Sequence, residues 1–481
     1  MDRNTKYKNY IIMNSWIEKN IQIDNDRIAI KTFNKSYTFN DLHKIIYSFI
    51  DNLKTIIKPN EAVGFLSEDI CEYAIFTNAV PMAKGIFVPL NPYTTKDELS
   101  KRLIQINCKK IIFTKKINLI DKLNNKEFDL IQIKKSSYSK NIKSFWPKKN
   151  DIHSILFTSG TSRIPKPVQL SVNNIETNCY MSQKNLKVSN EDIWLLCMPP
   201  FHAGGLSIIF RSMILGTSFY VENNFNSEKV VELIINGKVS IISLVPTMLL
   251  KVLDRIELSK QIIPDKFKFI LCGGAAVSEH LISRAEKLGI KVLPTYGMTE
   301  TCSQIATTSP EDHYRPKGSV GKSLSNIDIK FDKNNQILVS GPTVARYFGT
   351  KRRKKWLETG DLGYIDKSGY LYLIGRFDEQ IISGGENINP TEIESEIIKI
   401  PYIDEAVIFG IKDNYWGEKV VLAISSKKKN ISLEHINKKL KKLDSYKYPK
   451  KLIVFSDPLP KNNIGKIDKN KLKTKIAKCK V

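Results

Sequence analysis

The residues most able to do chemistry lie between Thr158 and Lys166, directly after an apolar stretch at 154–157. The segment reads Thr-Ser-Gly-Thr-Ser-Arg-Ile-Pro-Lys, so that small hydroxyl residues and a glycine precede a lysine. Backbone N–H groups and hydroxyls in such a turn can hold phosphate oxygens, while an ammonium group neutralises their charge. The pattern therefore predicts a phosphate-binding loop that uses Thr158, Ser159, Gly160, Thr161, Ser162 and Lys166.

This loop differs from the P-loop of nucleoside triphosphatases, whose pattern is G-x-x-x-x-G-K-[ST]. Lys166 follows Pro165 instead of a glycine, and Pro167 follows it instead of a serine or threonine. An ordinary Ser/Thr-rich surface turn is the alternative interpretation of the segment on its own. Residues further along the chain must decide between the two.

Three of those residues have side chains suited to a nucleotide or a carboxylic acid. Tyr296 can stack on a purine base, and Glu300 can hold the magnesium ion that accompanies polyphosphates. His202 lies in the turn Pro-Pro-Phe-His-Ala-Gly-Gly, where it could orient a substrate carboxylate or serve only as a core or capping histidine. Each residue alone is weak evidence for a site.

Strands and helices alternate around these residues. Predicted helices cover 39–53, 70–84 and 203–215, and another begins at 96; predicted strands cover 62–66, 86–89, 110–113, 154–157, 193–198, 239–245, 267–272 and 291–293. This rhythm predicts an α/β fold with a mostly parallel sheet, helices on both faces, and ligands beyond the carboxyl ends of the strands. Residues 122–150, rich in Lys and Asn, are weakly patterned and predict a variable excursion.

Composition places the chain among globular proteins. Its 481 residues, 42% hydrophobic and 9% aromatic, suit about two to four domains with a large core. No run of about eighteen apolar residues exists, and the first twenty residues mix charged with apolar types, so we expect neither a membrane span nor a signal peptide and a cytoplasmic location. Seven cysteines without a C-x-x-C pair argue against a disulfide framework or a structural zinc site.

The formal net charge of +26 raises the question of nucleic-acid binding. Lysine and arginine are spread along the chain, and no standard nucleic-acid-binding motif or interleaved aromatic pattern accompanies them. We interpret the charge as solvated basic faces and predict no nucleic-acid partner.

Five segments, in order, resemble the acyl-activating (adenylate-forming) superfamily, which includes acyl-CoA synthetases, luciferases and nonribosomal peptide adenylation domains. They are residues 158–166, 296–300, 359–361, 375–388 and 459–466. The resemblance covers the chain from about residue 37 to 467. It implies a large N-terminal AMP- and acyl-binding domain at 1–376, with parallel-rich sheets flanked by helices, and a small mobile α+β lid at 377–481.

The resemblance also implies a reaction with ATP, magnesium and coenzyme A. A carboxylate attacks the α-phosphorus of ATP, pyrophosphate leaves, and the thiolate of coenzyme A then displaces AMP to give a thioester. Two anions meet in the first step, so preorganised positive charge and N–H donors dominate its catalysis.

Site residues follow from the same resemblance. In the first domain, Gly273 and Gly274 line the adenine pocket, Tyr296 stacks on adenine, Thr299 bonds the α-phosphate, Glu300 contacts magnesium, and Asp361 and Arg376 hold the ribose. In the lid, Asp378 matches the hinge, Lys466 matches the lysine that bridges the acid and the α-phosphate, and Gly384 and Gly385 enter for the thioester step.

A narrower resemblance, at 200–207 with Arg211 and at 296–305, is to 2-succinylbenzoate–CoA ligases of menaquinone and phylloquinone biosynthesis. That substrate has a second carboxylate, which an apolar pocket accepts only beside a cation. Arg211, nine residues after His202, is the predicted partner, although it could instead be a surface residue of its helix. Gly204 lies in the same acyl pocket, where some of these ligases have a serine.

The phosphate loop departs from the family pattern, because Arg163 and Pro167 stand where glycines are common. If position 163 needs a positive φ, arginine costs roughly 1 kcal/mol or more, and proline removes an N–H group. Altered ATP affinity is therefore one hypothesis. An acyl- or aryl-CoA ligase for another acid and a non-catalytic ATP- or AMP-binding relative stay open as alternatives, as does a homo-oligomer.

Overall fold

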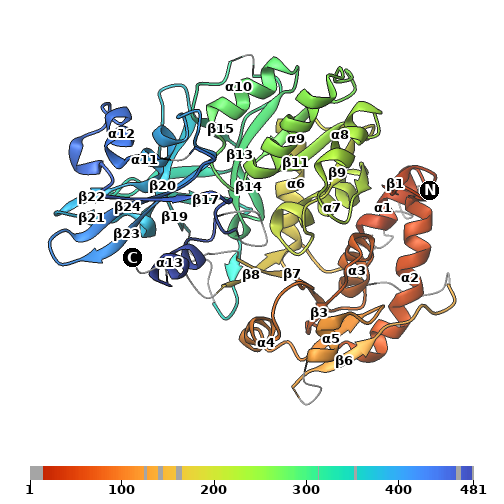
Figure 1. Ribbon diagram of the computed structural model, residues 1–481. Helices are drawn as coiled ribbons and strands as arrows, with labels where there is room; N and C mark the ends of the chain where they lie inside the picture. Colours follow the sequence, from red (N-terminus) through yellow and green to blue (C-terminus); the bar gives the residue numbers. More distant parts are fainter. Residues whose placement is uncertain are drawn as a thin grey trace, which may run out of the picture.

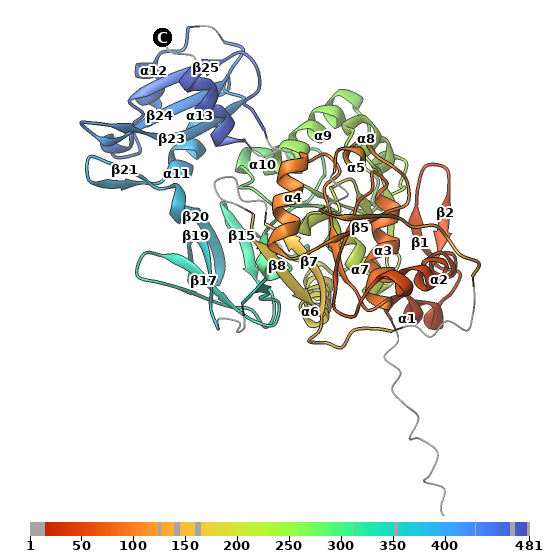
Figure 2. The same ribbon diagram turned by 90° about the horizontal axis from the view of Figure 1, so that it is seen from below.

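The computed structural model describes residues 15–123, 127–138, 145–158, 165–312, 314–350, 355–428, 430–461 and 467–478. Within these residues the chain forms two large sheets and a smaller third one, with helices packed on them (Figure 1). The smaller sheet belongs to the blue C-terminal part, which stands to one side of the rest in Figure 2. The predicted α/β fold, with a large parallel-rich N-terminal part and a smaller C-terminal part, is confirmed.

One large sheet, with seven strands among the described residues, runs in the order β18-β8-β7-β4-β3-β5-β6. Strands β3 to β7 pair in parallel, whereas β8 turns back antiparallel to β7 and carries β18 on its outer edge. The strands are β3 (Ala62–Phe65), β4 (Ile86–Pro89), β5 (Lys110–Phe113), β6 (Asp129–Gln132), β7 (Ile152–Phe157), β8 (Pro167–Ser171) and β18 (Arg346–Tyr347).

The other large sheet, with thirteen described strands, runs β16-β17-β19-β20-β15-β14-β13-β12-β11-β9-β10-β1-β2. Its half from β13 to β1 is parallel, and the half from β14 to β16 is antiparallel. The strands are β1 (Ile28–Lys31), β2 (Ser36–Thr38), β9 (Ile193–Leu196), β10 (Ser218–Val221), β11 (Ile241–Leu244), β12 (Phe269–Cys272), β13 (Val292–Met298), β14 (Ser303–Thr307), β15 (Ser319–Ser323), β16 (Asp328–Phe331), β17 (Gln336–Ser340), β19 (Leu357–Ile365) and β20 (Tyr370–Arg376).

Helices fill the space between the two large sheets and cover their outer faces. One continuous core joins both sheets through α1 (Trp16–Ile23), α2 (Phe39–Ile56), α3 (Ile70–Met82), α6 (Val172–Leu186) and α7 (Ala203–Leu215). The outer faces are covered by α4 (Lys96–Gln105) and α5 (Asn118–Lys122) on one side, and by α8 (Ser227–Ile235), α9 (Pro246–Ser259) and α10 (Glu279–Lys287) on the other. Parallel strands between such layers are buried on both faces, which explains why β9, β11 and β12 are almost continuously apolar.

The C-terminal part has its own sheet and its own core. Its described strands are β21 (Ile381–Ser383), β22 (Glu386–Ile388), β23 (Glu405–Asp413), β24 (Gly417–Ser425) and β25 (Lys451–Phe455). Its helices are α11 (Pro390–Ile397), α12 (Leu433–Lys439) and α13 (Lys469–Lys478). The short 3₁₀ turns η2 (Phe377–Glu379) and η3 (Ser445–Lys447) also lie in this part, whereas η1 (Thr299–Thr301) lies between β13 and β14. Its two apolar clusters draw their described members only from residues 381–476.

The segment 122–150 differs from its prediction, because it contains the edge strand β6, which pairs in parallel with β5. A half-buried strand of four residues at a sheet edge has little apolar pattern, so composition hid it. No helix of the described residues is long and apolar enough to cross a membrane.

Candidate active site

The two ends of the predicted phosphate loop are held together at the carboxyl end of β7. The Thr158 N–H donates to the Lys166 carbonyl at 3.0 Å, and the Lys166 N–H donates to Thr158 Oγ1 at 3.0 Å. This pairing places Lys166 beside Thr158, at the carboxyl end of β7. The other predicted loop residues lie outside the described residues: Ser159, Gly160, Thr161 and Ser162, together with Arg163.

Glu300 and Lys166 are brought together by strand β18. Because β18 pairs with β8, Tyr347 lies beside Lys166, whose Nζ is 5.3 Å from the centre of the tyrosine ring. The Tyr347 hydroxyl donates a 3.0 Å hydrogen bond to Oε1 of Glu300. Sequence reasoning missed Tyr347, since no spacing rule connects two residues 47 positions apart.

The Glu300 carboxylate fits a magnesium site. Burial raises the pKa of Glu300, while the Tyr347 hydrogen bond and the charge of Lys166 oppose that rise. Within the described residues no basic side chain forms an ion pair with it, and no cluster of three or more potential metal ligands exists. A single protein carboxylate suits Mg²⁺, which usually keeps several waters and takes phosphate oxygens as further ligands.

Asp361 lies at the centre of a second cluster. Its Oδ2 accepts a 2.7 Å hydrogen bond from the Tyr296 hydroxyl, and its Oδ1 accepts one of 3.0 Å from Nη1 of Arg376. Asp361 and Arg376 are register partners on the antiparallel strands β19 and β20, which explains why residues 15 positions apart meet. The arrangement presents a carboxylate with fixed orientation, as a ribose-binding residue requires.

Tyr296 is almost completely buried within the core beneath β14. Burial and the charge of Asp361 raise the pKa of Tyr296 well above its usual value, so the hydroxyl stays protonated and keeps its donor role. Stacking of its ring on adenine remains a prediction.

Gly273, Gly274 and Thr299 follow the carboxyl ends of β12 and β13. A Cβ atom on Gly273 would lie 2.5 Å from Cγ2 of Thr295, so that no larger residue fits there. Gly274 has φ of +78°, a conformation that side chains rarely adopt. Thr299 begins the turn η1, one residue before Glu300. The structure therefore places these residues at the edge of the sheet where ligands bind, and their nucleotide contacts stay predictions.

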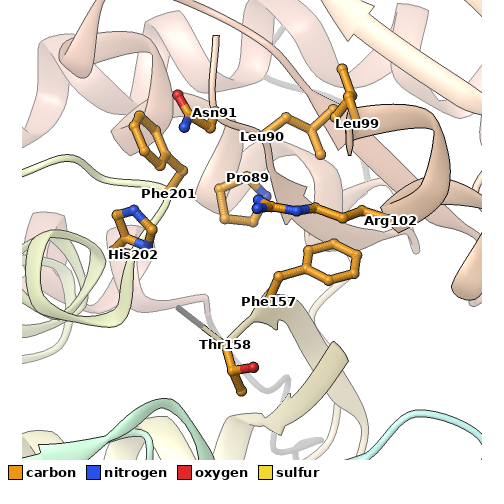
Figure 3. Close-up of a pocket in the computed structure, with 9 residues that line it drawn as sticks. All are labelled: Pro89, Leu90, Asn91, Leu99, Arg102, Phe157, Thr158, Phe201 and His202. Atoms are coloured by element: carbon orange, nitrogen blue, oxygen red, sulfur yellow. The ribbon is translucent and has the colours of Figure 1, made fainter. Parts of the chain in front are cut away.

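His202 and Thr158 line the same small pocket (Figure 3). His202 is the N-cap of α7, and a Cβ on Gly205 would lie 2.3 Å from the Pro199 carbonyl, so the helix begins tightly against that turn. At Gly204 a Cβ would meet Cε of Met198 at 2.8 Å, the end of a flexible side chain that can move aside. The start of α7 thus fixes the direction of His202.

Arg102 on α4 lines this pocket as well, and sequence reasoning missed it. The guanidinium carbon of Arg102 lies 5.8 Å from the centre of the Phe157 ring, and the guanidinium pairs with Glu98. Phe157 is the neighbour of Thr158 in Figure 3. The signal for it in the sequence was slight, since an arginine on an amphipathic helix is usually a surface residue.

Arg211 is buried, only 2% exposed, so the alternative of a surface residue is wrong. It does not line the pocket of Figure 3. Its nitrogens donate to Ser207 Oγ at 3.3 Å and Gln304 Oε1 at 3.1 Å, and its guanidinium carbon lies 4.9 Å from the Trp194 ring centre. All these partners are neutral, and burial lowers the pKa of Arg211. A buried cation without an acidic partner among the described residues is suited to an anionic ligand.

The residues predicted for the lid follow β20 in the chain. Asp378 accepts a 3.1 Å hydrogen bond from Nε of Arg376. Gly384 and Gly385, with φ of +61° and +84°, form the two-residue turn between β21 and β22, and Gly384 donates to the Trp416 carbonyl at 2.8 Å. Lys466 lies outside the described residues.

Comparison with known proteins matches nearly the whole chain. Residues 17–347 match the family model of AMP-binding enzymes, and residues 392–466 match that of the AMP-binding enzyme C-terminal domain. The 2-succinylbenzoate–CoA ligase of Oceanobacillus iheyensis is 33% identical over 95% of this chain and 98% of its own length. That of Listeria monocytogenes serovar 1/2a is 31% identical over 97% of this chain and 100% of its own length.

Solved structures agree with these matches. O-succinylbenzoate coenzyme A synthetase from Bacillus subtilis, in complex with ATP and magnesium ion, superposes with a TM-score of 0.85 at 29% identity, covering 95% of this chain and 99% of that one. The same enzyme in complex with its acyl-adenylate intermediate also has a TM-score of 0.85, at 29% identity, over 95% of this chain and 98% of that one.

Proposed function

Since this chain belongs to the AMP-binding enzyme family, we propose that it is a 2-succinylbenzoate–CoA ligase. It joins 2-succinylbenzoate to coenzyme A with ATP, and it releases AMP and diphosphate in a step of menaquinone or phylloquinone biosynthesis. The observation that carries the choice of acid is the agreement over almost the full length with 2-succinylbenzoate–CoA ligases. The buried Arg211 gives a physical reason for a second carboxylate.

In the first step, an oxygen of the substrate carboxylate bonds to the α-phosphorus of ATP, and the bond to diphosphate breaks. We assign the triphosphate to the loop 158–166, with the Lys166 ammonium beside it, and the ribose hydroxyls to Asp361. Each well-placed donor at such a reacting centre contributes several kcal/mol, or roughly 10²–10³ in rate. Tyr296 and Arg376 hold the Asp361 carboxylate in a fixed orientation before the nucleotide arrives.

Magnesium, when bound, neutralises the charge that gathers on the phosphate oxygens. Glu300 is the residue that would hold it, and the hydrogen bond from the Tyr347 hydroxyl fixes the orientation of its carboxylate. Thr299 and His202 complete our assignment, with Thr299 at the α-phosphate and His202 beside the carboxylate that is activated.

In the second step, the sulfur of coenzyme A bonds to the acyl carbon, its proton is lost, and the bond to AMP breaks. We propose that residues 1–376 form the substrate-binding domain, and that residues 377–481 form a lid that turns about Asp378 between the steps. Lys466 serves the first step, and the turn at Gly384 and Gly385 serves the second. Positive φ at both glycines closes this two-residue turn, in which the Gly384 N–H donates to the Trp416 carbonyl.

The partners that this assignment requires are small molecules: the aromatic diacid, ATP and coenzyme A. A cytoplasmic location is part of the proposal, because ATP and coenzyme A are supplied there. The +26 charge is assigned to solvated faces.

The test is diphosphate release by the purified protein with three matched acids. 2-Succinylbenzoate has both carboxylates, 2-butanoylbenzoate lacks the chain carboxylate, and 3-benzoylpropionate lacks the ring carboxylate. We expect rapid diphosphate release with the diacid and at least about a hundredfold lower kcat/KM with either monoacid. One carboxylate of the diacid is activated and the other pairs with Arg211, so each monoacid lacks one of these two groups. Equal rates with a monoacid would indicate another acyl- or aryl-CoA ligase. No release with any acid would indicate a non-catalytic nucleotide-binding protein.

A further inference from the structure

Gln304 on β14 holds the guanidinium of Arg211. Its side-chain Oε1 accepts a 3.1 Å hydrogen bond from Nη2 of Arg211, and Gln304 is only 3% exposed. An arginine side chain has donors and no acceptor, so the amide of Gln304 must turn its oxygen toward the guanidinium and its NH₂ group away from it. Arg211 therefore fixes which end of the amide faces α7.

Two threonines bind the other end of this amide. Nε2 of Gln304 donates to Oγ1 of Thr307 at 2.8 Å and to Oγ1 of Thr295 at 3.2 Å. The oxygens of the two threonine hydroxyls lie 2.6 Å apart, and the Thr295 hydroxyl donates to the Ala306 carbonyl at 3.3 Å. Every polar atom of the Gln304 side chain is thus hydrogen-bonded, so the side chain cannot turn away from Arg211 without leaving buried polar groups unpaired.

The backbone before Gln304 has an unusual conformation. Cys302 and Ser303 have φ of +59° and +122°, which residues with side chains rarely adopt. Nδ2 of Asn178 on α6 donates to the carbonyls of Thr301 and Gln304 at 3.4 and 3.1 Å, and it holds this turn in place. Strained backbone persists only where the surrounding structure fixes it, and it is concentrated at functional sites. Here it fixes the position from which the Gln304 side chain reaches α7.

Gln304 orients Arg211 without neutralising it. The described partners of the guanidinium are the oxygens of Gln304 and Ser207 and the ring of Trp194, all of them neutral. Nε of Arg211 has no acceptor among the described residues. A glutamate at position 304 would have the same length and an accepting oxygen, but its carboxylate would cancel the charge of Arg211. The amide keeps the cation in place and leaves its charge for an anion.

We propose that Gln304 is a positioning residue that determines specificity for the diacid, because it holds the Arg211 guanidinium, with its charge uncompensated, for the second carboxylate. The inference rests on the proposed function, which pairs that carboxylate with Arg211. Gln304 acts through Arg211 and not through a contact with the substrate.

The test compares Gln304→Glu and Gln304→Met with the wild type. Diphosphate release gives kcat/KM for 2-succinylbenzoate and for whichever monoacid, 2-butanoylbenzoate or 3-benzoylpropionate, the wild type uses better. That monoacid has the carboxylate that is activated and lacks the other, so the ratio of the two kcat/KM values measures recognition of the second carboxylate alone. We expect this ratio to fall about tenfold to a hundredfold in Gln304→Glu and about threefold to tenfold in Gln304→Met, while KM for ATP stays within about twofold.

Unfolding in urea separates this role from a structural one. Gln304→Glu gives the buried cation an acidic partner and should raise the urea concentration at the midpoint of unfolding, whereas Gln304→Met removes an acceptor from Arg211 and should lower it. Both variants should nevertheless lose discrimination between the two acids. If Gln304 serves only the core, both acids should be affected alike and the kcat/KM ratio should keep its wild-type value.

Asn20 provides a matched control at a different arginine. It is 3% exposed, its Oδ1 accepts a 2.9 Å hydrogen bond from Nη2 of Arg27, and its Nδ2 donates to two backbone carbonyls. Nε of Arg27 also has no acceptor among the described residues. Asn20→Asp should therefore raise the unfolding midpoint, as Gln304→Glu does, and leave the kcat/KM ratio unchanged.

A wild type that prefers the diacid, together with the same preference in Gln304→Glu, would overturn the inference while the proposed function stands. A fall of the ratio in Asn20→Asp would do the same. If Gln304→Glu does not fold, an unchanged ratio in Gln304→Met has that meaning. A wild-type ratio near one would refute both the proposed acid and the role of Gln304, and a wild type that releases no diphosphate with any acid would overturn the proposed function and the inference together.

Discussion

Replacing Arg211 by methionine should make the free protein more stable and its acid binding weaker. The guanidinium is 2% exposed, and its described partners are the neutral oxygens of Ser207 and Gln304 and the ring of Trp194. Its Nε has no acceptor among the described residues. Methionine fills a similar volume without a charge, so the substitution removes the desolvation cost and keeps most of the packing.

The two effects can be given magnitudes. Replacing the unpaired buried charge by an apolar group removes the desolvation penalty of one ion, which is several kcal/mol and is taken here as about 4 kcal/mol. Two neutral hydrogen bonds and a cation–π contact oppose this with roughly 1 kcal/mol each. We therefore expect a gain of about 1 kcal/mol. The complex loses a buried, charge-assisted pair with the second carboxylate, about 3 kcal/mol or roughly a hundredfold in KM.

The assays are urea unfolding without ligand and diphosphate release across 2-succinylbenzoate concentrations. Arg315→Met is the matched control, because Arg315 is also largely buried but binds both oxygens of Glu279 at 2.7 and 2.8 Å. That variant should lose stability and keep its KM. If Arg211→Met instead loses stability and retains the wild-type KM, Arg211 is a structural residue and its assignment to the acid is refuted.

Three further predictions concern other residues. Tyr347→Phe removes the hydrogen bond that opposes the raised pKa of Glu300, so a proton competes better with magnesium; the magnesium concentration for half-maximal diphosphate release should rise about tenfold, more at pH 6 than at pH 8. Lys466→Ala should reduce acyl-adenylate formation at least about a hundredfold, and an undiminished rate would contradict the proposed chemistry. His153 is buried against Trp16, and burial lowers its pKa to about 3. The unfolded chain takes up a proton below pH 6.5 and the folded chain does not, so stability falls as the pH drops through 6.5, by about 2 kcal/mol at pH 5. In His153→Phe, the free energy of unfolding measured with urea should no longer fall between pH 6.5 and pH 5. The same pH dependence in the variant and the wild type would disprove this prediction.

The fold was predictable where burial of an element gives it a clear apolar sequence pattern. Strands such as β9 and β12 lie between helix layers, so every position is apolar, and the helices between them have their own spacing. The edge strand β6 has solvent on one side and was missed.

The candidate site was predictable residue by residue, but not in its contacts. Motifs named Glu300, Asp361 and Arg376 as candidates, and the structure adds that Asp361 is held from both sides, while their roles stay predictions. Tyr347 and Arg102 could not be predicted from the sequence, because each lies on a distant element and joins the candidate site through a tertiary contact. Local patterns carry no information on such pairs.

The turn η2 buries none of its three residues, and the apolar clusters on its two sides share no described member. One described contact across this point is polar, since Nδ2 of Asn389 donates to the Ile374 carbonyl at 2.6 Å. Because the two cores are separate, we expect each side to open and close as its own cooperative unit, with its own pattern of amide exchange. A ligand that contacts both parts should couple their unfolding, so that one thermal melting transition replaces two.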